Sequence, residues 1–191
     1  MRTELSKLHQ KLQTTTIYVT HDQTEAMTMA SRLVVMKDGI IQQIGTPKDV
    51  YENPKIVFVG GFIGSPAMNF FDGRIGDNKL VIGDTYFKIP DDKLLILRDQ
   101  YYIGKEVIFG IRPEDIHNAL LNSSENTGFD AKVNVFELTG AESLIYSTLA
   151  KKEFVARLDS NVNLAAGVSV QLKFDMYSGH FFDKDTELQI H

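Results

Sequence analysis

The chain has 191 residues, of which 43% are hydrophobic and 24% charged, with no cysteine and a formal net charge of −5 at pH 7. The lack of cysteine excludes disulfide bonds and thiolate metal ligands, and the acidic balance argues against sequence-independent binding to nucleic acid. No apolar run reaches the ~18 residues that would span a bilayer, and the polar N-terminal segment lacks the apolar core of a secretion signal. The composition therefore predicts a soluble, cytoplasmic globular protein.

Residues 1–45 have the pattern of an α/β fold. Three leucines at helical spacing predict a first short amphipathic helix: Leu5, Leu8 and Leu12. An apolar, β-branched run at 15–20 predicts a strand of the kind that is buried inside a parallel sheet. Asp22, followed three residues later by Glu25, has the pattern of a capping box and predicts the start of a second helix. His21 is thereby placed where a strand ends and a helix begins, which is where open α/β sheets hold their ligands.

The next signals predict a hairpin, two short helices and a linker. An Asp-Gly pair at 38–39 lies between two apolar runs, as in a β-hairpin. The Thr-Pro pair at 46–47 predicts a helix start, with proline at the first helical position, and this helix should end before Pro54. A second apolar helix is expected at 56–62, and the Gly-Ser-Pro breaker at 64–66 marks the end of the first domain.

The sequence from Met68 onward predicts short β-strands separated by turns. The candidate strands are 70–75, 80–82, 86–89, 106–111, 129–138, 143–149, 153–158, 169–174 and a final strand at 180–183. Their regular spacing is typical of a small Greek-key barrel or sandwich and not of βαβ units. We therefore expect two domains, 1–66 and 67–191.

Some local features have more than one interpretation. The glycine-rich stretch 60–64 could form a phosphate loop, but no lysine follows and Pro66 interrupts the helix such a loop needs, so we interpret it as a hinge. Arg112 could belong to a ligand-binding turn, an interface pair or a barrel corner. Because Pro113 favours extended geometry at the preceding residue, Arg112 ends a strand, and a structural role is favoured. The other histidines show no metal-ligand spacing and are expected to be solvated: His9, His117, His180 and His191.

Several separate motifs resemble one family. The segment 17–27, with sequence IYVTHDQTEAM, resembles the switch-histidine segment of ABC-transporter ATPases, and motifs within 38–54 continue the resemblance in register. The segment 61–70 is similar to the linker of the ATPases that drive carbohydrate import, the maltose and multiple-sugar transporter subfamily. The segment 110–114 resembles a strand and turn in their regulatory domain. The resemblance covers essentially the whole chain and is weakest between about 120 and 165.

The resemblance implies a role for His21. In this family, the histidine at the position of His21 contacts the γ-phosphate of ATP and helps to position the attacking water and the catalytic carboxylate. An imidazole N–H can donate a strong, charge-assisted hydrogen bond to a phosphate oxygen, and this bond exists only while the γ-phosphate is present. ATP and Mg²⁺ are therefore the cofactors expected of the intact parent protein.

Other motifs of the family do not occur. The sequence contains no Gly-x-x-x-x-Gly-Lys-Ser/Thr phosphate loop. The Gly-Lys pair in the segment 104–106 does not form one, because it lacks both the preceding glycine at the required spacing and the following Ser or Thr. The Leu-Ser-Gly-Gly-Gln signature, the glutamine loop and the strand ending in Asp-Glu are also missing, and the apolar run 94–99 ends in Arg98-Asp99 instead. We expect an N-terminally truncated ABC ATPase that, on its own, neither binds ATP tightly nor hydrolyses it, and holds no metal.

The expected fold is an α/β remnant of an ABC nucleotide-binding domain followed by an all-β, OB-like Greek-key regulatory domain. The expected function is that of a C-terminal fragment of a sugar-importer ATPase that serves dimerisation and regulation. Its partners would be a second copy, bound through the regulatory domain, the membrane-spanning permease subunits, and a regulatory protein, at the cytoplasmic face of the plasma membrane. The alternative is a free-standing, protein-binding regulatory module. A third possibility, a small-ligand or oligonucleotide-binding barrel, is disfavoured, because the charge balance is acidic and no dense stripe of basic and aromatic residues is present.

The missing part of the ATPase domain would leave apolar surface exposed. We therefore predict that residues 1–45 are mobile, domain-swapped or adhesive, whereas 68–191 form the stable unit.

Overall fold

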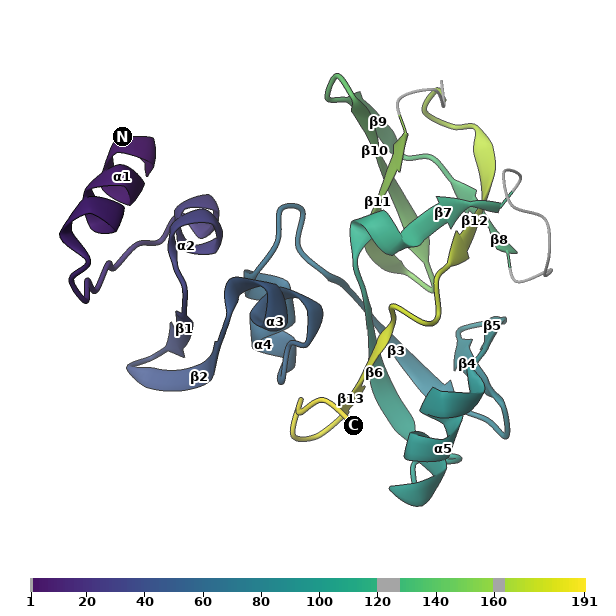
Figure 1. The fold of residues 1–191 in the computed structure, drawn as a ribbon. Coiled ribbons are helices and arrows are strands. Elements are labelled where there is room, and N and C mark those ends of the chain that lie inside the picture. The colour runs from purple at the N-terminus through teal and green to yellow at the C-terminus, as the bar shows by residue number, and fades with distance from the viewer. Residues whose placement is uncertain (1, 120–127, 160–163) are drawn as a thin grey trace. The chain divides into compact units, whose positions relative to one another are not determined.

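The computed structural model describes residues 2–119, 128–159 and 164–191, and it divides into two compact units, Met1–Gly64 and Ser65–His191 (Figure 1). The first unit contains four helices and one hairpin within its described residues. The elements are α1 (Arg2–Leu12), α2 (Gln23–Met29), β1 (Leu33–Lys37), β2 (Ile40–Gly45), α3 (Pro47–Glu52) and α4 (Val57–Phe62).

The short-range signals of the first unit are confirmed. Asp38 and Gly39 have φ angles of 51° and 78°, which match a tight hairpin turn between β1 and β2. Thr46 caps α3 by accepting a hydrogen bond from the Asp49 N–H, and Pro47 is the first helical residue. A small core holds the unit together and consists of Leu33, Val35, Val50, Val59 and Ile63.

The strand predicted at 15–20 is absent from the structure. This segment has no regular secondary structure, and Ile17 and Val19 are 89% and 90% exposed. A strand of a parallel sheet needs neighbouring strands, and no described strand pairs with this segment. The prediction was wrong because the local sequence has strand character, but no described part of the chain pairs with it.

The second unit is mostly β-structure, as predicted for 67–191. A five-stranded antiparallel sheet has the order β13-β6-β3-β4-β5. Its strands are β3 (Asn69–Ile75), β4 (Lys79–Ile82), β5 (Thr85–Lys88), β6 (Glu106–Ile111) and β13 (His180–Asp183). Helix α5 (Asp91–Asp99) follows β5, and Leu94 and Leu97 are the residues of this helix buried in the core. This helix was not among the predicted elements.

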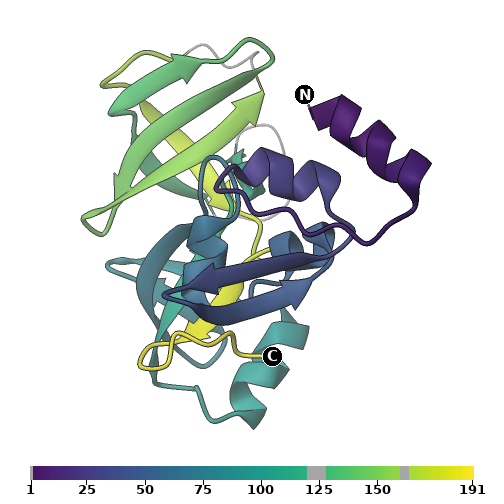
Figure 2. The ribbon, with the colours of Figure 1, turned by 90° about the vertical axis from the view of Figure 1, so that its left-hand side faces the viewer.

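Two three-stranded antiparallel sheets complete the described part of the second unit. One has the order β7-β12-β8, formed by β7 (Ile116–Asn118), β12 (Ser169–Phe174) and β8 (Gly128–Lys132). The other has the order β11-β10-β9, formed by β11 (Lys152–Asp159), β10 (Glu142–Leu149) and β9 (Val135–Leu138), and its strands lie side by side in green in Figure 2. The run predicted as one strand at 129–138 is thus divided between two sheets, and a 3₁₀ turn at Pro113–Asp115 precedes β7.

An aromatic cluster joins these sheets into one core. Phe174 on β12 lies at its centre, with its ring centroid 4.6 Å from that of Phe87 and 4.9 Å from that of Phe129. The rings of Phe71 and Phe109 are 5.5 Å and 5.9 Å from the same side chain. These partners come from β5, β8, β3 and β6, so one residue of β12 packs against strands of two sheets.

A buried amide connects β3 to a strand of another sheet. Asn69 is 8% exposed, and its Nδ2 donates to the carbonyl oxygens of Val155 at 2.9 Å and Ile111 at 3.3 Å. The backbone N–H of Val155 donates back to Asn69 Oδ1 at 2.8 Å. The Asn69 side chain therefore provides the hydrogen-bond partners of the Val155 backbone where β3 meets β11.

Candidate functional site

His21, the one candidate catalytic residue of the sequence, lies in the turn that precedes α2 and has an exposed side chain. Within the described part of the chain, no hydrogen bond or ion pair involves its imidazole. Both ring nitrogens are thus accessible to a ligand, and the turn that carries them is built by the neighbouring residues.

A single carboxylate braces this turn. Glu25 Oε2 accepts hydrogen bonds from Tyr18 Oη at 3.0 Å and from Thr20 Oγ1 at 2.9 Å. Thr20 Oγ1 in turn accepts from the Asp22 N–H at 3.0 Å. The hydrogen bond from Tyr18 to Glu25 raises the pKa of the tyrosine, and the nearby negative charge acts in the same direction. Two residues before His21 are therefore bonded to the Glu25 side chain, and Asp22, directly after His21, is connected to it through Thr20.

The predicted cap of α2 is confirmed, but Glu25 acts differently from a capping-box residue. Asp22 Oδ1 accepts from the N–H groups of Thr24 at 2.8 Å and Glu25 at 3.1 Å, as an N-cap does. In a capping box, the Glu25 carboxylate would accept from the Asp22 N–H, but here that group bonds to Thr20. The Tyr18–Thr20–Glu25 brace was missed by the sequence reasoning, which assigned Glu25 to the cap.

The residues present do not form a complete site for ATP and Mg²⁺. The sequence has no phosphate loop, and among the described residues no group of three or more His, Asp or Glu side chains is placed to hold a metal ion. Likewise, no described helix is both long and apolar enough to cross a membrane.

The other residues considered from the sequence have different environments. Arg112 is buried, with 3% of its surface exposed, at the end of β6, which agrees with a structural role. His180 was expected to be solvated, and this was wrong. It is partly buried on β13, with Nδ1 3.1 Å from Gln189 Nε2. Burial, reinforced by the charges of Lys93 and Arg112, lowers the pKa of His180 to about 4. His9 and His191 are exposed, whereas His117 on β7 is partly buried.

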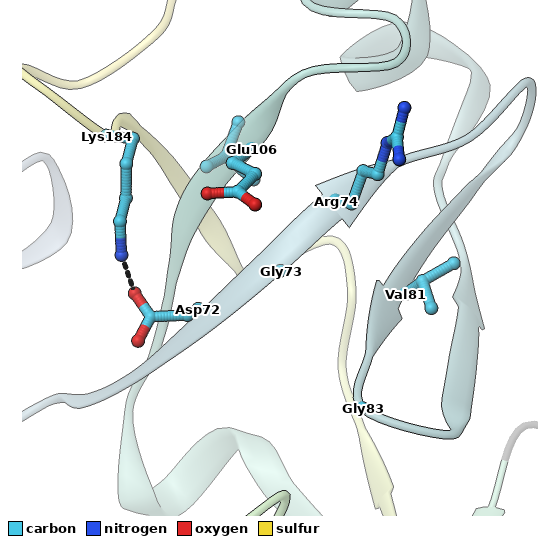
Figure 3. Close-up of a pocket in the computed structure, with 8 residues that line it drawn as sticks. Asp72, Gly73, Arg74, Val81, Gly83, Glu106 and Lys184 are labelled. Carbon is cyan, nitrogen blue, oxygen red and sulfur yellow. Dashed lines mark hydrogen bonds and ion pairs between the residues drawn. The ribbon is translucent and has the colours of Figure 1, made fainter.

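A shallow cavity of about 260 Å³ lies beside β3 in the second unit (Figure 3). Its lining contains two cations and two carboxylates: Arg74, Lys184, Asp72 and Glu106. The Lys184 ammonium and the Asp72 carboxylate point toward one another and form an ion pair, and Arg74 Nε donates to the Gly104 carbonyl at 2.9 Å. Because both cations already have partners and the charges of the lining balance, the cavity favours no class of ligand.

The β1–β2 hairpin has apolar residues on both faces. Leu33 and Val35 point into the core, whereas Val34 pairs with Ile44 and Met36 with Ile41 on the opposite face. These four side chains, which we call the outer hairpin face, are each 44–53% exposed.

Comparison with known proteins identifies the two β-rich segments. Residues 64–116 match the MalK OB fold domain, and residues 109–182 match the TOBE domain. Over its whole length, the chain is 59% identical to the oligosaccharides import ATP-binding protein MsmX of Bacillus subtilis, of which it covers 53%. It is 44% identical to the multiple sugar-binding transport ATP-binding protein MsmK of Streptococcus mutans, of which it covers 54%.

A third relative also matches nearly the whole chain over about half of its own length. The trehalose/maltose import ATP-binding protein MalK of Thermococcus litoralis is 43% identical over 97% of the chain, and the chain covers 51% of it. Among solved structures, the molybdate-binding protein ModG aligns with 59% of the chain at 13% identity and a TM-score of 0.46, a likeness too weak to carry an argument.

The domain matches and the β-rich architecture define the second unit as a MalK-type OB fold joined to a TOBE domain. The chain belongs to the family of ABC-transporter ATP-binding subunits of carbohydrate importers and corresponds to the C-terminal part of its members. It spans about half the length of the curated relatives it matches. The resemblance inferred from the motifs is thereby confirmed.

Proposed function

We propose that the chain acts as the C-terminal part of the ATP-hydrolysing subunit of a sugar ABC importer, in which it carries the γ-phosphate-sensing histidine and the regulatory domain. The observation that carries the proposal is homology along the full chain to proteins named as sugar-import ATP-binding proteins. In this assignment, 1–66 is the α/β remnant of the nucleotide-binding domain and 67–191 is the regulatory domain.

His21 is the residue to which we assign chemistry. An N–H of its exposed imidazole would donate to an oxygen of the ATP γ-phosphate, a charge-assisted hydrogen bond that is lost after hydrolysis and phosphate release. The brace of Tyr18, Thr20 and Glu25 supports this role, because it fixes the backbone on both sides of the histidine. Fixing the donor before ATP arrives reduces the reorganisation needed at the reaction step.

The remainder of the ATP and Mg²⁺ site would come from sequence that the relatives carry outside the matched half. The sequence has no phosphate loop, and the described residues hold no group of three or more metal ligands, so we expect the chain alone to bind neither ATP nor Mg²⁺ tightly. Coupling to transport would need contacts with membrane-spanning permease subunits at the cytoplasmic face of the plasma membrane. Residues 67–191 would bind a second copy of the subunit and, for regulation, another protein.

Sugar uptake tests the proposal. In cells that lack the Bacillus subtilis relative, a chimera joins the N-terminal half of that relative to this chain at the start of the matched region. We expect the chimera to restore oligosaccharide-dependent growth and its His21→Ala variant to fail at equal protein level, with His9→Ala on α1 as the matched control. A stable chimera that does not restore uptake, together with capture of a defined protein partner by this chain alone, would favour the alternative of a free-standing regulatory module.

A further inference from the structure

The peptide group that follows His21 is held by the side chain that precedes it. The Asp22 N–H, which belongs to the His21–Asp22 peptide group, donates to Thr20 Oγ1 at 3.0 Å. The same hydroxyl donates its own proton to Glu25 Oε2 at 2.9 Å. Because a hydroxyl has one proton and two acceptor lone pairs, both bonds can exist at once. They form a relay that runs from the backbone through Thr20 to the carboxylate.

The carboxylate sets the direction of this relay. An ionised carboxylate only accepts hydrogen bonds, so the Thr20 proton points to Glu25 and the Thr20 lone pairs remain available to the backbone N–H. Each bond also polarises the next, which strengthens a chain of this kind. Thr20 and Glu25 are partly buried, whereas His21 is exposed, so the relay is better shielded from water than the imidazole is. Loss of the Glu25 carboxylate should therefore weaken a hydrogen bond in which Glu25 takes no part.

Asp22 is held on its other side by the start of α2. Its Oδ1 accepts from the N–H groups of Thr24 at 2.8 Å and Glu25 at 3.1 Å. The residue after His21 is thus bonded to Thr20 through its backbone and to the helix through its side chain. The His21–Asp22 peptide group cannot rotate without breaking the bond to Thr20. The relay therefore restrains the backbone from which the imidazole of His21 extends.

The second donor to Glu25 has a lesser part in this arrangement. Tyr18 Oη donates to Glu25 Oε2 at 3.0 Å, and among the described residues its hydroxyl makes no hydrogen bond to the His21–Asp22 peptide group. Tyr18 thus helps to hold the carboxylate in place, whereas Thr20 connects the carboxylate to the backbone. The two hydroxyls that bond to one oxygen atom therefore differ in what their removal should do.

We propose that Thr20, oriented by the Glu25 carboxylate, is the positioning residue of His21 in ATP hydrolysis. This inference rests on the proposed function, in which the imidazole donates to the γ-phosphate. Neither Thr20 nor Glu25 needs to touch the nucleotide, because both act through the peptide group that follows the histidine. Errors in the placement of a group that acts on the transition state lower the rate of the chemical step more than they weaken substrate binding.

Hydrogen exchange of the Asp22 amide in the whole chain, measured by NMR, tests the relay without nucleotide. Thr20→Val removes the hydroxyl and should raise the exchange rate of this amide about fivefold, as expected for the loss of one hydrogen bond. Glu25→Ala is the decisive variant, because it leaves donor and acceptor in place and should nevertheless raise the same rate. Tyr18→Phe should raise it less than either. Thr24→Val, at an exposed threonine in the first turn of α2, is the matched control.

The Ala26 amide shows whether the start of α2 stays intact in these variants. Its N–H donates to the Asp22 carbonyl oxygen at 3.1 Å and takes no part in the relay. Unchanged exchange at Asp22 in Glu25→Ala, with the Ala26 amide still protected, would overturn the proposal. If Glu25→Ala exposes the Ala26 amide, Glu25→Gln takes its place. Glu25→Gln retains a neutral acceptor, so the relay predicts an exchange rate at Asp22 between those of the wild type and Thr20→Val.

ATP hydrolysis by the chimera with the Bacillus subtilis relative tests the positioning role. Thr20→Val should lower kcat about tenfold, the effect of a displaced donor, and should change the equilibrium ATP affinity much less. Thr20→Ser retains the hydroxyl and should hydrolyse ATP at nearly the unsubstituted rate, as should Thr24→Val.

The His21→Ala chimera separates failure of this inference from failure of the proposed function. Hydrolysis that is lost in His21→Ala but retained in Thr20→Val would overturn the positioning role alone. Hydrolysis that is retained in both variants would contradict the proposed function, and the positioning role would fall with it. A parallel loss of ATP affinity and kcat in Thr20→Val, without rescue by Thr20→Ser, would also overturn the inference, because it would indicate general disruption of the segment.

Discussion

The hydroxyl of Tyr102 donates a 2.7 Å hydrogen bond to Asp183 Oδ2, which connects the segment after α5 to the end of β13. The other oxygen of the same carboxylate accepts from the Thr186 N–H at 2.8 Å and from the Asp185 N–H at 3.1 Å. These bonds, with the backbone contact to Thr186 as the largest contribution, lower the pKa of Asp183 to about 2. Burial, followed by the bond to Asp183, raises the pKa of Tyr102 to about 12.

Asp183 should therefore contribute to the stability of the regulatory unit in a pH-dependent way. Its folded-state pKa is below its ordinary value of 3.8, so the contribution is present above pH 4 and is lost as the pH falls toward 2. We expect Asp183→Asn to lower the urea midpoint at pH 7 but to have little effect near pH 2. Equal losses at both pH values would contradict the assignment. Asp185→Asn, an exposed neighbour, is the matched control.

Truncation of the Phe174 side chain should lower the stability of the second unit more than most other substitutions. Its ring contacts aromatic side chains from two sheets, so Phe174→Ala removes packing that no single neighbour can restore. We expect the free energy of unfolding of the Ser65–His191 unit to fall by roughly 3–5 kcal/mol, with a smaller loss for Phe174→Leu. Urea denaturation followed by circular dichroism measures the change. Tyr177→Ala, at a side chain that is 73% exposed, should be nearly neutral.

A third prediction concerns the Asn69 side-chain amide. It stabilises the fold through the backbone groups of Val155 to which it is hydrogen-bonded. Asn69→Ala leaves the N–H and the carbonyl of Val155 without their present partners and should cost about 1–3 kcal/mol. Asn69→Asp retains the acceptor for the Val155 N–H but loses the donor, so it should not restore stability. Amide exchange at Val155 reads out the contact directly. An unchanged exchange rate there in Asn69→Ala would show that the amide does not hold the two strands together.

The outer hairpin face should cause self-association of the chain. Four apolar side chains that are about half exposed on one face form a contiguous adhesive surface: Val34, Met36, Ile41 and Ile44. We expect Ile41→Lys to weaken association roughly tenfold, the effect of removing one apolar side chain from an apolar contact. Sedimentation velocity over a range of concentrations measures this. Leu95→Lys on α5, where the side chain is 57% exposed, is the control, and an equal effect there would contradict a specific role of the hairpin.

Local chemistry made much of the fold predictable from the sequence. The Asp-Gly turn, the Thr46-Pro47 helix start and the Asp22 cap depend on neighbouring residues, and each was confirmed. Most strands of the second unit were also found, because alternating burial leaves a period-two pattern. Helix α5 was missed although Leu94 and Leu97 have helical spacing, since the short apolar run 94–97 also suits a strand.

The failures concern features that depend on distant partners. The strand expected at 15–20 would need neighbouring strands, and no described strand pairs with this segment. The partial burial of His180 follows from its position on β13. The hydrogen bonds of Asn69 with Val155, Gln23 with Gly64 and Arg157 with Ser65 join residues 41 to 92 positions apart, and no local sequence pattern predicts them. His21 was singled out by its place between an expected strand and an expected helix, whereas its role came only from the resemblance of its segment to a family motif and stays a prediction.

The most direct test of the central claim is the rate of ATP hydrolysis by the purified chimera with the Bacillus subtilis relative, with and without His21→Ala. We predict that the substitution lowers the rate roughly 100-fold, as expected for the loss of one donor to the transferring group, while His9→Ala leaves it unchanged. ATP binding, measured separately at equilibrium, should be much less affected than hydrolysis. Hydrolysis by His21→Ala at the rate of the unsubstituted chimera would contradict the assignment of His21 as the γ-phosphate sensor.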